Sequence, residues 1–512
     1  MNIAMTGVIL ITTALCGIVA LLLYHFGRLR LYIEAAKFPG PRTLPVIGNA
    51  HYFVGNTADI LNKIMELLNS YPSPFRIWLG NRLFIVVHDA EQMKTIFHSP
   101  KTIEKEDLYK FVRPWLGTGL FTAPAIKWRI HRKLIMPTFN SRILESFVEV
   151  FGKQSEVMTQ QMRNELQAGE FDIFHYISLC TLDIICETAM GVTVKAQTEK
   201  NCRYVTSAKR VFEVIFTRIF KIWLHPNFIF NLTKLGRDQH ECVEYLHGVT
   251  NNVIRMKKSF YKETRVENES AHERPVTRKA FLDLLIELSN DGTKLTDEEL
   301  REEVDTMMIA GNDTTATVNS FAMLMLANFP EVQRRAYQEL CEIYGDEVFS
   351  GAPIRNEHLS RMDYLERVIK ETMRLFPVGP ILVRQVTENL NIGECTLPKG
   401  SSVVLAILKL HRSEKYWSDP LKFDPDRFLP EEVAKRHPYC YVPFSAGPRN
   451  CLGLKYAMMA MKVLLATVLR RYVLKKDEIL DICDIKLKAD IMLKPVKTVT
   501  IRIFERSQRE YQ

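Results

Sequence analysis

The sequence predicts one large, mainly α-helical body with a small β portion, preceded by a single membrane-spanning helix. Residues 127–345 are dominated by helical periodicity, whereas residues 75–88, 383–410 and 485–503 form short apolar runs bounded by turn residues. The composition fits a globular protein with a large core, because 47% of the 512 residues are hydrophobic and 25% are charged. These proportions exclude a mainly disordered chain, a collagen and a multi-span membrane protein.

The membrane helix is predicted from residues 7–26, which contain no charged side chain and are long enough to cross the hydrocarbon core. Arg28, Arg30 and Lys37 follow, and the positive-inside rule places them in the cytosol together with the rest of the chain. A cleaved signal peptide is the rival, but the first six residues lack the basic side chains that precede its apolar run. We therefore expect residues 1–27 to be an uncleaved anchor.

A basic, proline-rich hinge is predicted over residues 28–45. Pro39 and Pro41 flank Gly40, and this arrangement favours a stiff, non-helical joint. Because no later segment divides the chain, residues 46–512 are predicted to form a single domain.

Local signals define the main elements of that domain. Thr296 and Glu299 form a capping box, which opens a long and largely buried helix that ends near Asn328. Residues 255–279 are polar and are predicted to be a solvated loop. The other expected elements are a hairpin at 75–88, a helix at 360–376, strands at 383–410, an apolar helix at 453–472 and terminal strands at 485–503.

Charge and cysteine usage narrow the class of protein. The formal charge of +9 permits an anionic membrane surface or an acidic protein partner, and no motif indicates a nucleic-acid partner. The ten cysteines include no Cys-x-x-Cys pair, which argues against a zinc ribbon or a thioredoxin-type site. They are also too sparse for a disulfide scaffold, so we expect reduced thiols in a cytosol-facing protein.

The strongest chemical signal is the loop that carries Phe444, Gly447, Arg449, Cys451 and Gly453 before the apolar helix. Backbone N–H dipoles at a helix start favour a thiolate at Cys451. Gly447 permits a tight turn, and Gly453 permits the close approach of a flat group. For an isolated cysteine in this position, a buried structural thiol would be the simpler interpretation.

This loop resembles the haem-binding loop of the cytochrome P-450 superfamily, Phe-x-x-Gly-x-Arg-x-Cys-x-Gly, at all five fixed positions. The resemblance implies the cytochrome P-450 fold, in which haem lies between a long central helix and the cysteine-ligand loop. It also implies that Cys451 is the axial ligand of the haem iron, where a thiolate donates electron density and favours O–O cleavage.

Four further residues are implied as contacts of the anionic haem propionates. Trp128 and Arg132 are spaced i, i+4 on one helix face and resemble the family's Trp-x-x-x-Arg helix. Arg384 and Arg449 match additional propionate contacts, for which guanidinium groups are natural donors. Without this context, each arginine would be interpreted as a solvated cation.

A structural triad is implied by a second resemblance. Glu371 and Arg374 lie i, i+3 on one helix face, a spacing that is usually a surface ion pair. Arg427, in Phe-Asp-Pro-Asp-Arg-Phe, matches the family's meander arginine. The resemblance therefore implies that these three residues form a buried, fold-stabilising triad with no catalytic role.

The middle of the long helix carries Ala310-Gly-Asn-Asp-Thr-Thr. Gly311 and the threonines are poor helix-interior residues, and a threonine can bond back to the i−4 carbonyl, so a local opening is expected. An ordinary kinked core helix is the alternative. The motif resembles the family's acid–alcohol pair, which implies that Thr314 orients oxygen and that Asp313 relays protons during oxygen activation.

Within the superfamily, residues 181–191 and the sequence Glu303-Val-Asp-Thr resemble the family 4 group, which includes microsomal fatty-acid ω-hydroxylases and insect enzymes. Many members have a glutamate in place of Ala310, and that glutamate can form an ester with haem. Ala310 cannot, so we expect haem b (iron protoporphyrin IX) to be bound noncovalently. The same departure weakens a prediction of strict terminal-carbon selectivity.

The resemblance also implies partners. The expected electron donor is NADPH–cytochrome reductase, with cytochrome b5 as a further candidate, docked on the basic stretches 127–133 and 453–476. By family position, the phenylalanine-rich residues 212–230 would cover a pocket that membrane lipid can reach, with plain core packing as the alternative, and the loop 101–121 would form another wall. Such a pocket suits an apolar small-molecule substrate.

These observations together predict a haem-thiolate monooxygenase of the endoplasmic reticulum membrane with a cytosolic catalytic domain. It would insert one atom of O2 into a fatty acid, another lipid, a hormone or a xenobiotic, using NADPH electrons. One rival is a haem-thiolate isomerase or peroxide-rearranging enzyme, against which the retained Asp313 and Thr314 argue. The other is a non-catalytic haem-binding sensor.

Overall fold

The computed structural model describes residues 11–13, 15, 19, 29–199, 203–269, 281–290, 295–348 and 351–506. The predicted anchor, residues 1–27, lies outside these residues except at a few positions and stays a prediction. Among the described residues, one helical run, Ile173–Met190, is long and apolar enough to cross a membrane. Because 78% of that run is buried inside the protein, it has the environment of a core helix.

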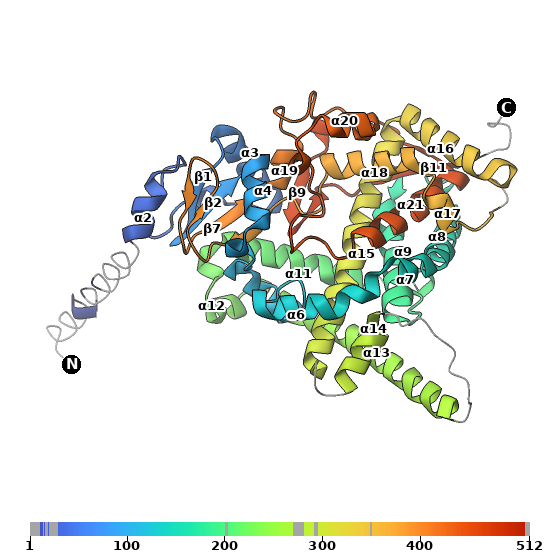
Figure 1. The fold of residues 1–512 in the computed structure, drawn as a ribbon, viewed down its shortest axis with the longest axis horizontal. Coiled ribbons are helices and arrows are strands. Elements are labelled where there is room, and N and C mark those ends of the chain that lie inside the picture. The colour runs from blue at the N-terminus through green and yellow to red at the C-terminus, as the bar shows by residue number, and fades with distance from the viewer. Residues whose placement is uncertain are drawn as a thin grey trace.

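Helices make up most of the described chain, as the sequence predicts (Figure 1). The α-helices are α2 (Leu29–Ala36), α3 (Thr57–Ser70), α4 (Ala90–His98), α5 (Arg113–Leu116), α6 (Ala125–Ile135), α7 (Ser141–Ser146), α8 (Val148–Met162), α9 (Ile173–Ile185), α10 (Ala196–Glu199), α11 (Arg203–Phe220), α12 (Asn227–Leu232), α13 (Lys234–Glu269), α14 (Phe281–Asn290), α15 (Asp297–Asn328), α16 (Pro330–Tyr344), α17 (Asn356–Leu359), α18 (Asp363–Leu375), α19 (Ile407–His411), α20 (Pro430–Ala434) and α21 (Leu454–Arg471).

The strands form small sheets (Figure 1). The largest sheet has the order β1-β2-β7-β4, in which β2 and β7 are parallel and the other pairs are antiparallel. The predicted hairpin at 75–88 is confirmed as β1 and β2. The strands are β1 (Phe75–Leu79), β2 (Arg82–Val87), β3 (Phe171–Asp172), β4 (Leu382–Gln385), β5 (Leu390–Asn391), β6 (Thr396–Leu397), β7 (Ser402–Leu405), β8 (Tyr472–Lys475), β9 (Leu487–Asp490), β10 (Met492–Pro495) and β11 (Thr500–Glu505).

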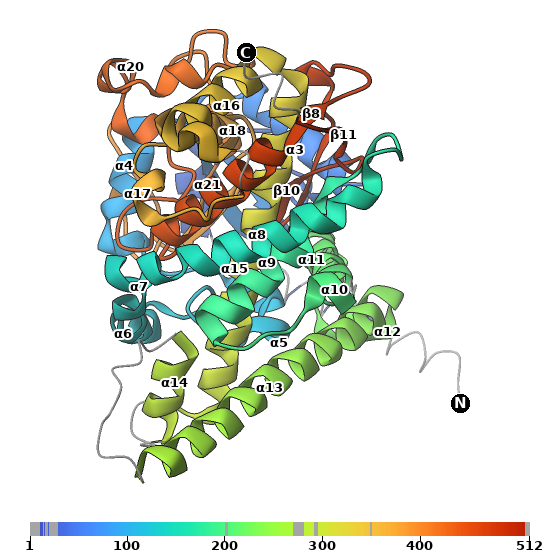
Figure 2. The same cartoon turned by 90° about the vertical axis from the view of Figure 1, so that its right-hand side faces the viewer.

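The long helix α15 runs through the middle of the molecule (Figures 1 and 2). Its capping box is formed as predicted: the Glu299 N–H donates to Thr296 Oγ1 over 3.1 Å, and the Thr296 N–H donates to Glu299 Oε2 over 3.0 Å. Most of its residues from Leu300 to Asn328 are buried, and it packs against α9, α18 and α21. The helix therefore forms the core on which the site is built.

The predicted hinge is more ordered than the sequence suggests. Residues Leu29–Ala36 form helix α2, so only the later part of the 28–45 segment is non-helical. The Arg76 N–H of β1 donates to the Pro39 carbonyl over 2.8 Å. A Cβ on Gly40 would lie 2.3 Å from the Arg76 carbonyl oxygen, so glycine is needed for this close approach. The segment is thus docked on the sheet, and the boundary with the domain 46–512 stays a prediction.

The prediction of a solvated loop at 255–279 is wrong for its first part, because α13 continues to Glu269. Two of its lysines pair with neighbouring helices. The ammonium of Lys257 lies 2.9 Å from Asp283 of α14, and that of Lys258 lies 3.0 Å from Asp297 of α15. Figure 2 shows α14 beside α13. Residues 270–279 lie outside the described part of the chain.

The predicted triad is formed in the core. Glu371 and Arg374 are fully buried, and Arg374 donates from Nε and Nη2 to the two carboxylate oxygens of Glu371 over 2.7 and 2.8 Å. Arg427 Nε lies 3.5 Å from Glu371 Oε1. Arg374 also donates to the carbonyls of His411 and Pro420, which ties α18 to the segment leading into the cysteine loop. Two-point pairing of this kind is the strongest form of a buried ion pair.

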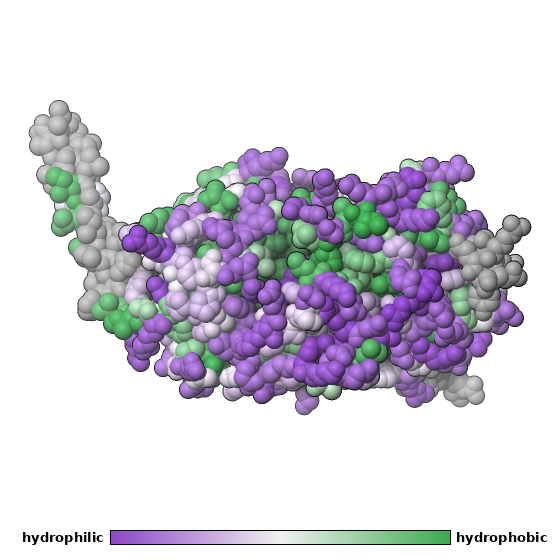
Figure 3. All heavy atoms as spheres, turned by 90° about the horizontal axis from the view of Figure 1, so that it is seen from above, coloured by the Kyte–Doolittle hydropathy of each residue, from purple (hydrophilic) through white to green (hydrophobic). Residues whose placement is uncertain are grey.

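The molecular surface is mostly polar. Figure 3 shows hydrophilic side chains over most of one face, with hydrophobic side chains gathered in its hollowed middle and near the N-terminal end. At that end, α2 exposes Leu29 and Ile33. These residues follow the predicted anchor directly in the chain.

Candidate active site

The cysteine loop is a tight turn fixed by backbone hydrogen bonds. The Cys451 N–H donates to the Phe444 carbonyl over 2.9 Å, and the Asn450 N–H donates to the Gly447 carbonyl over 3.1 Å. Gly447 has a φ of +69°, and a Cβ there would lie 2.1 Å from the Phe97 carbonyl oxygen. Only glycine meets both conditions, so its predicted role in the turn is confirmed.

Cys451 is an exposed residue, and its thiol has many protein atoms around it. Burial raises the pKa of the Cys451 thiol, while the Gly453 N–H and the charge of Arg132 lower it. The sequence-based idea that N–H groups at the start of α21 favour the thiolate thus applies, against a larger opposing effect of burial. A Cβ on Gly453 would lie 4.0 Å from Cys451 Sγ, so the backbone beside the sulfur is not crowded.

Helix α6 places two predicted residues beside the loop. Arg132 donates from Nη1 to the Asn450 carbonyl over 2.7 Å and from Nη2 to Asn450 Oδ1 over 2.6 Å. Trp128 is buried one turn earlier on the same helix face. Arg449 donates to the Ala123 carbonyl over 2.7 Å and places its guanidinium carbon 4.7 Å from the centre of the Trp128 ring. The structure therefore brings Trp128, Arg132 and Arg449 together.

A group of three cations, Arg384, Arg449 and Lys105, lies beside this point, and Arg384 is the buried one. Arg384 lies on β4, is almost fully buried, and forms an isolated bridge with Lys105. Burial lowers the pKa of Arg384, and burial together with Arg384 and Arg449 lowers that of Lys105 well below its usual value. Burial also lowers the pKa of Arg449 to about 10. The negative charge of Glu104 raises the pKa of Arg449. The Glu104 carboxylate itself accepts a hydrogen bond from the Ala125 N–H over 2.9 Å.

Lys105 is a residue that the sequence-based reasoning missed. Its ammonium lies 4.5 Å from the centre of the Tyr109 ring and 4.8 Å from that of Phe121. No local motif marks it, because its neighbours at the site come from β4 and from the cysteine loop. It adds a positive charge to a place that already has two arginines.

These residues fit an anionic group such as the haem propionates. Buried Arg449 Nε and Nη1 have no hydrogen-bond partner among the described residues, which is costly for a guanidinium group. Clustered cations of this kind need a negatively charged partner. A small cavity beside them is lined by Ile96, Phe97, Thr102, Ile103, Arg384, Ala446, Pro448 and Arg449.

Helix α15 presents an open face in the same region. Ala310 is exposed and Thr314 is partly exposed, although the residues around them on the helix are mostly buried. They are spaced i, i+4 and therefore share a face, and α15 packs directly against α21, the helix that follows Cys451. The Thr314 hydroxyl donates to the Ala310 carbonyl, as predicted.

The expected local opening of α15 at Gly311 does not occur, because the helix is continuous from Asp297 to Asn328. A Cβ on Gly311 would lie 2.5 Å from Cδ1 of Ile185. The glycine is thus explained by the close packing of α15 on α9. The open face comes from Ala310 and Thr314 without any break in the helix.

Asp313 does not share this face. Its Oδ1 accepts a hydrogen bond from the Lys494 ammonium of β10 over 2.6 Å, and both side chains are buried. The structure therefore brings the predicted acid to a lysine on the terminal sheet, about a quarter turn of helix away from Thr314 at 3.6 residues per turn.

The loop predicted as a pocket wall is fastened to the first half of α15. The Leu120 N–H donates to Glu303 Oε2 over 3.1 Å, and His131 of α6 lies 2.7 Å from the other oxygen of Glu303. A Cβ on Gly117 would lie 1.9 Å from Glu302 Oε1, so the chain needs glycine there. Glu303 belongs to the Glu-Val-Asp-Thr motif, whose resemblance to the family 4 group gave it no role. The structure gives Glu303 a role in holding this loop and α6 to α15.

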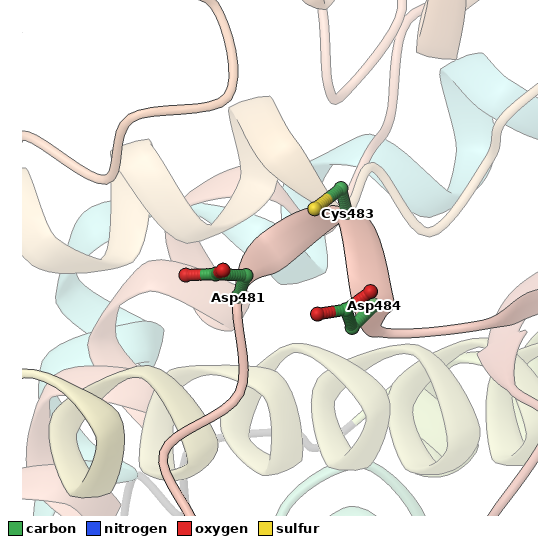
Figure 4. Close-up of side chains that lie close together, drawn as sticks. All are labelled: Asp481, Cys483 and Asp484. Carbon is green, nitrogen blue, oxygen red and sulfur yellow. The ribbon is translucent and has the colours of Figure 1, made fainter.

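A second group of potential ligands lies outside the site. Asp481, Cys483 and Asp484 have ligand atoms within 4.8 Å of one another, and all three side chains are exposed. Figure 4 shows them on one short segment. Exposed acidic groups of this kind are common without an ion, so no function is assigned to them.

Comparison with known proteins agrees with this geometry. The family model described as Cytochrome P450 matches residues 38–502. Cytochrome P450 4c3 of Drosophila melanogaster is 36% identical over 97% of this chain and 95% of its own length. Cytochrome P450 4V2 of Mus musculus is 38% identical over 91% of this chain and 89% of its own length. Cytochrome P450 4c21 of Blattella germanica is 38% identical over 92% of this chain and 94% of its own length. The chain therefore belongs to the cytochrome P450 family, is similar to family 4 members over most of its length, and is a haem-dependent monooxygenase.

Proposed function

We propose that this protein inserts one atom of O2 into an apolar substrate, using NADPH electrons that a membrane-bound reductase delivers. The candidate substrates are fatty acids, other lipids, hormones and xenobiotics. The observation that carries the proposal is the meeting of three features: the Cys451 loop, the group of three cations, and an open face on α15.

Each part of the site has a role in this proposal. Cys451 binds the iron, with Phe444 and Gly453 shaping the loop around it. Arg384, Arg449 and Lys105 would bind the propionates. Arg132 and Trp128 would add contacts to the same groups from α6. Bound haem supplies the iron centre at which O2 is reduced and one oxygen atom is transferred to the substrate.

Two residues of α15 would act on oxygen. Thr314 places its hydroxyl on the open face and would orient oxygen there when its proton turns from the Ala310 carbonyl. Asp313 lies about a quarter turn from that face and is paired with Lys494, so it would supply protons there after turning from the lysine. Ala310 places only a methyl group there, so haem b is held noncovalently by the thiolate, the cations and apolar packing.

The electron donor docks on the exposed face of α6. Arg129 and Lys133 are exposed there, next to Ile126, which is 78% exposed, and Ile130, which is 56% exposed. Apolar side chains flanked by cations suit an acidic protein partner. Reductase is the proposed main donor, and cytochrome b5 would use the same face.

The stretch 453–476 contributes less to docking than the sequence suggests. Lys462 and Arg470 are buried, Arg471 pairs with Glu156, and Lys476 pairs with Glu170. Lys455 is the cation of this stretch that remains exposed next to the cysteine loop. Most cations of this stretch are therefore buried or already paired, and few of them are available to a protein partner.

The apolar end of the molecule faces the endoplasmic reticulum membrane in this proposal. Trp223, Phe228 and Leu232 are exposed around α12, whereas Phe212, Phe216 and Phe230 are buried. Figure 1 places α12 in the same, left-hand part of the molecule as α2. Both features suit a single-pass anchor at residues 1–27, a cytosolic catalytic domain, and contact of membrane lipid with the substrate entrance.

The deciding experiment reconstitutes full-length protein with NADPH–cytochrome reductase in lipid vesicles and screens apolar substrates by product mass spectrometry. We expect an NADPH-dependent product that is heavier by one oxygen atom. Rearranged products formed from peroxides without reductase would instead indicate a haem-thiolate isomerase or peroxide-rearranging enzyme. Haem binding without any turnover across a broad panel would favour the sensor.

A second measurement tests the ligand assignment. Cys451→Ala should abolish the red-shifted ferrous–CO band, because the band requires a thiolate ligand. Cys440→Ala is the matched control, since Cys440 is a buried thiol on another part of the loop region. An unchanged band in Cys451→Ala would overturn the assignment.

A further inference from the structure

The stripe of α15 that contains the open face continues toward the start of the helix. Ala310 and Glu303 are seven residues apart, so Glu303 lies about two turns and about 10 Å earlier, within about 20° of the same direction around the helix axis. Ala310 is exposed, whereas Glu303 is fully buried. One end of the stripe is therefore open and the other end is covered.

The covering element is the turn of residues 117–122. The Leu120 N–H donates to Glu303 Oε2 over 3.1 Å, and His131 Nδ1 of α6 lies 2.7 Å from Glu303 Oε1. Both oxygens of the carboxylate are thus engaged, one by the turn and one by α6. A buried N–H that loses its acceptor is costly, so this contact fixes the place of the turn along the helix.

The turn also touches α15 through its glycines. A Cβ on Gly119 would lie 2.5 Å from Thr306 Oγ1 and 2.6 Å from the Glu302 carbonyl oxygen, so only glycine allows this approach. Thr118 Oγ1 donates to Glu302 Oε2 over 3.0 Å, which gives a second point of attachment. The turn therefore lies tightly on α15, about one helical turn before Ala310.

The middle residues of the turn lie between its attachment and the cation group. Leu120 is buried beside Glu303, and the next residue, Phe121, is 38% exposed. The Phe121 ring lies 5.6 Å from the ring of Tyr109 and 4.8 Å from the ammonium of Lys105. Phe121 is thus held at both sides and keeps accessible surface, as a pocket wall requires.

We propose that Glu303 is a positioning residue that sets how far the turn 117–122 stands from the open face of α15, and that it thereby limits the width of the substrate that can reach the haem iron. Glu303 touches neither substrate nor haem and acts through the Leu120 N–H. This inference rests on the proposed haem site and adds its size selectivity, which favours slender apolar molecules over bulky ones.

The chemistry of residue 303 can be varied in two steps. Glutamine keeps an acceptor oxygen for the Leu120 N–H and offers an N–H to His131, so the turn stays attached. Leucine has a similar size but neither group, so it releases the turn. The positioning role therefore predicts that Glu303→Gln resembles wild type, whereas Glu303→Leu does not.

The first test measures hydrogen exchange of the backbone amides of the turn in the full chain. Glu303→Leu should speed exchange at Leu120 several-fold, because the N–H loses its acceptor. Asp183→Asn is the matched control, since Asp183 is a buried carboxylate that accepts the N–H groups of Ala196 and Gln197 in another segment. It should leave exchange at Leu120 unchanged. Wild-type exchange at Leu120 in Glu303→Leu would overturn the inference.

The second test measures the Kd of two ligands of haem iron from the shift of the haem absorption band. Imidazole is the small ligand, and 1-tritylimidazole is the bulky one. Glu303→Leu should lower the ratio of the trityl Kd to the imidazole Kd several-fold, because a released turn makes room for the trityl group while imidazole needs none. Glu303→Gln should restore most of the wild-type ratio.

Gly119→Ala changes the same distance without changing Glu303, and it serves if Glu303→Leu does not fold. Its methyl group would meet Thr306 Oγ1 and push the turn away from α15, so the ratio of the two Kd values should fall as well. Gly152→Ala on α8 is the matched control, because a Cβ there has no atom within 4 Å. This control should keep the wild-type ratio.

The outcomes separate the inference from the proposed function. A wild-type ratio in both Glu303→Leu and Gly119→Ala would overturn the inference, and so would an equal fall in Glu303→Gln or Gly152→Ala. A wild-type holoenzyme whose absorption band does not respond to imidazole would instead overturn the proposed haem site. The exchange measurement would then still decide whether Glu303 holds the turn.

Discussion

Arg449 places its guanidinium carbon over the ring of Trp128 at 4.7 Å and leaves Nε and Nη1 without partners among the described residues. The arginine is thus oriented by the tryptophan and by the Ala123 carbonyl, with its free N–H groups available to an anion. This arrangement supports propionate binding more directly than any single sequence match.

We predict that Arg449→Met weakens haem binding. Loss of one charge-assisted contact costs about 1.5–3 kcal/mol, which corresponds to roughly ten- to a hundredfold in affinity. The measurement is haem transfer from the variant to an excess of apomyoglobin. Lys105→Met should show a smaller loss in the same direction, and Arg334→Met, an exposed arginine of α16 outside the cation group, should leave the transfer rate close to that of wild type. Equal rates for all variants would contradict the cation group as the propionate site.

We predict that acid–organic extraction releases all the haem from the wild-type chain. Ala310 has exposed surface on the open face of α15 but carries no carboxylate that could form an ester. Ala310→Glu, after turnover with NADPH, should retain a fraction of its haem on the chain, as seen by mass spectrometry of the intact protein. Haem that stays on the wild-type chain would contradict noncovalent binding.

We predict that charge reversal on α6 weakens donor binding. Arg129→Glu with Lys133→Glu should raise the KM for reductase several-fold at low salt, and the difference should shrink as salt screens the charges. Lys435→Glu, directly after α20, is the control for reversal of an exposed lysine elsewhere. The ferrous–CO spectrum should be unchanged in all three proteins. A KM equal to that of wild type would remove α6 as the docking face.

Asp305 gives a pH-dependent contribution to stability. It is buried on α15, where its Oδ1 accepts the Thr250 hydroxyl over 2.5 Å and its Oδ2 lies 3.6 Å from His247 Nε2 and 3.9 Å from Arg301 Nε. Burial raises the pKa of Asp305 from 3.8 to about 7, against the lowering effects of Thr250 and Arg301. The folded protein therefore binds more protons than the unfolded chain between these two values. By linkage, its contribution to stability is full below the unfolded value and is lost as pH rises toward 7.

We predict that Asp305→Asn removes the loss of stability that Asp305 causes as pH rises. The unfolding temperature of the variant should therefore fall less than that of wild type between about pH 5 and 8. The effect amounts to a few kcal/mol, at roughly 1.4 kcal/mol for each pKa unit. His247→Gln is the control for the neighbouring imidazole. Burial lowers the pKa of His247, so this group makes a pH-dependent contribution to stability of the opposite sign. Parallel pH curves for wild type and Asp305→Asn would refute the prediction.

The helices at 296–328, 360–376 and 453–472 and the local part of the site could be predicted from sequence. The capping box at Thr296, the turn at Gly447 and the shared face of Trp128 and Arg132 all depend on residues a few positions apart. Short-range spacing determines which groups a helix or a turn places together, so these features follow from local geometry. The loop predicted at 255–279 is wrong over 255–269, where α13 continues and Lys257 and Lys258 pair with α14 and α15 across the fold.

The sequence by itself determined the cysteine loop, the long central helix and the family to which they point. Only the tertiary structure decided that Lys105 joins Arg384 and Arg449, that Gly311 lies against Ile185, and that Asp313 faces Lys494. The physical reason is the distance along the chain. Contacts between residues that are tens to hundreds of positions apart depend on how helices and strands pack, and the identity of one partner does not specify the other.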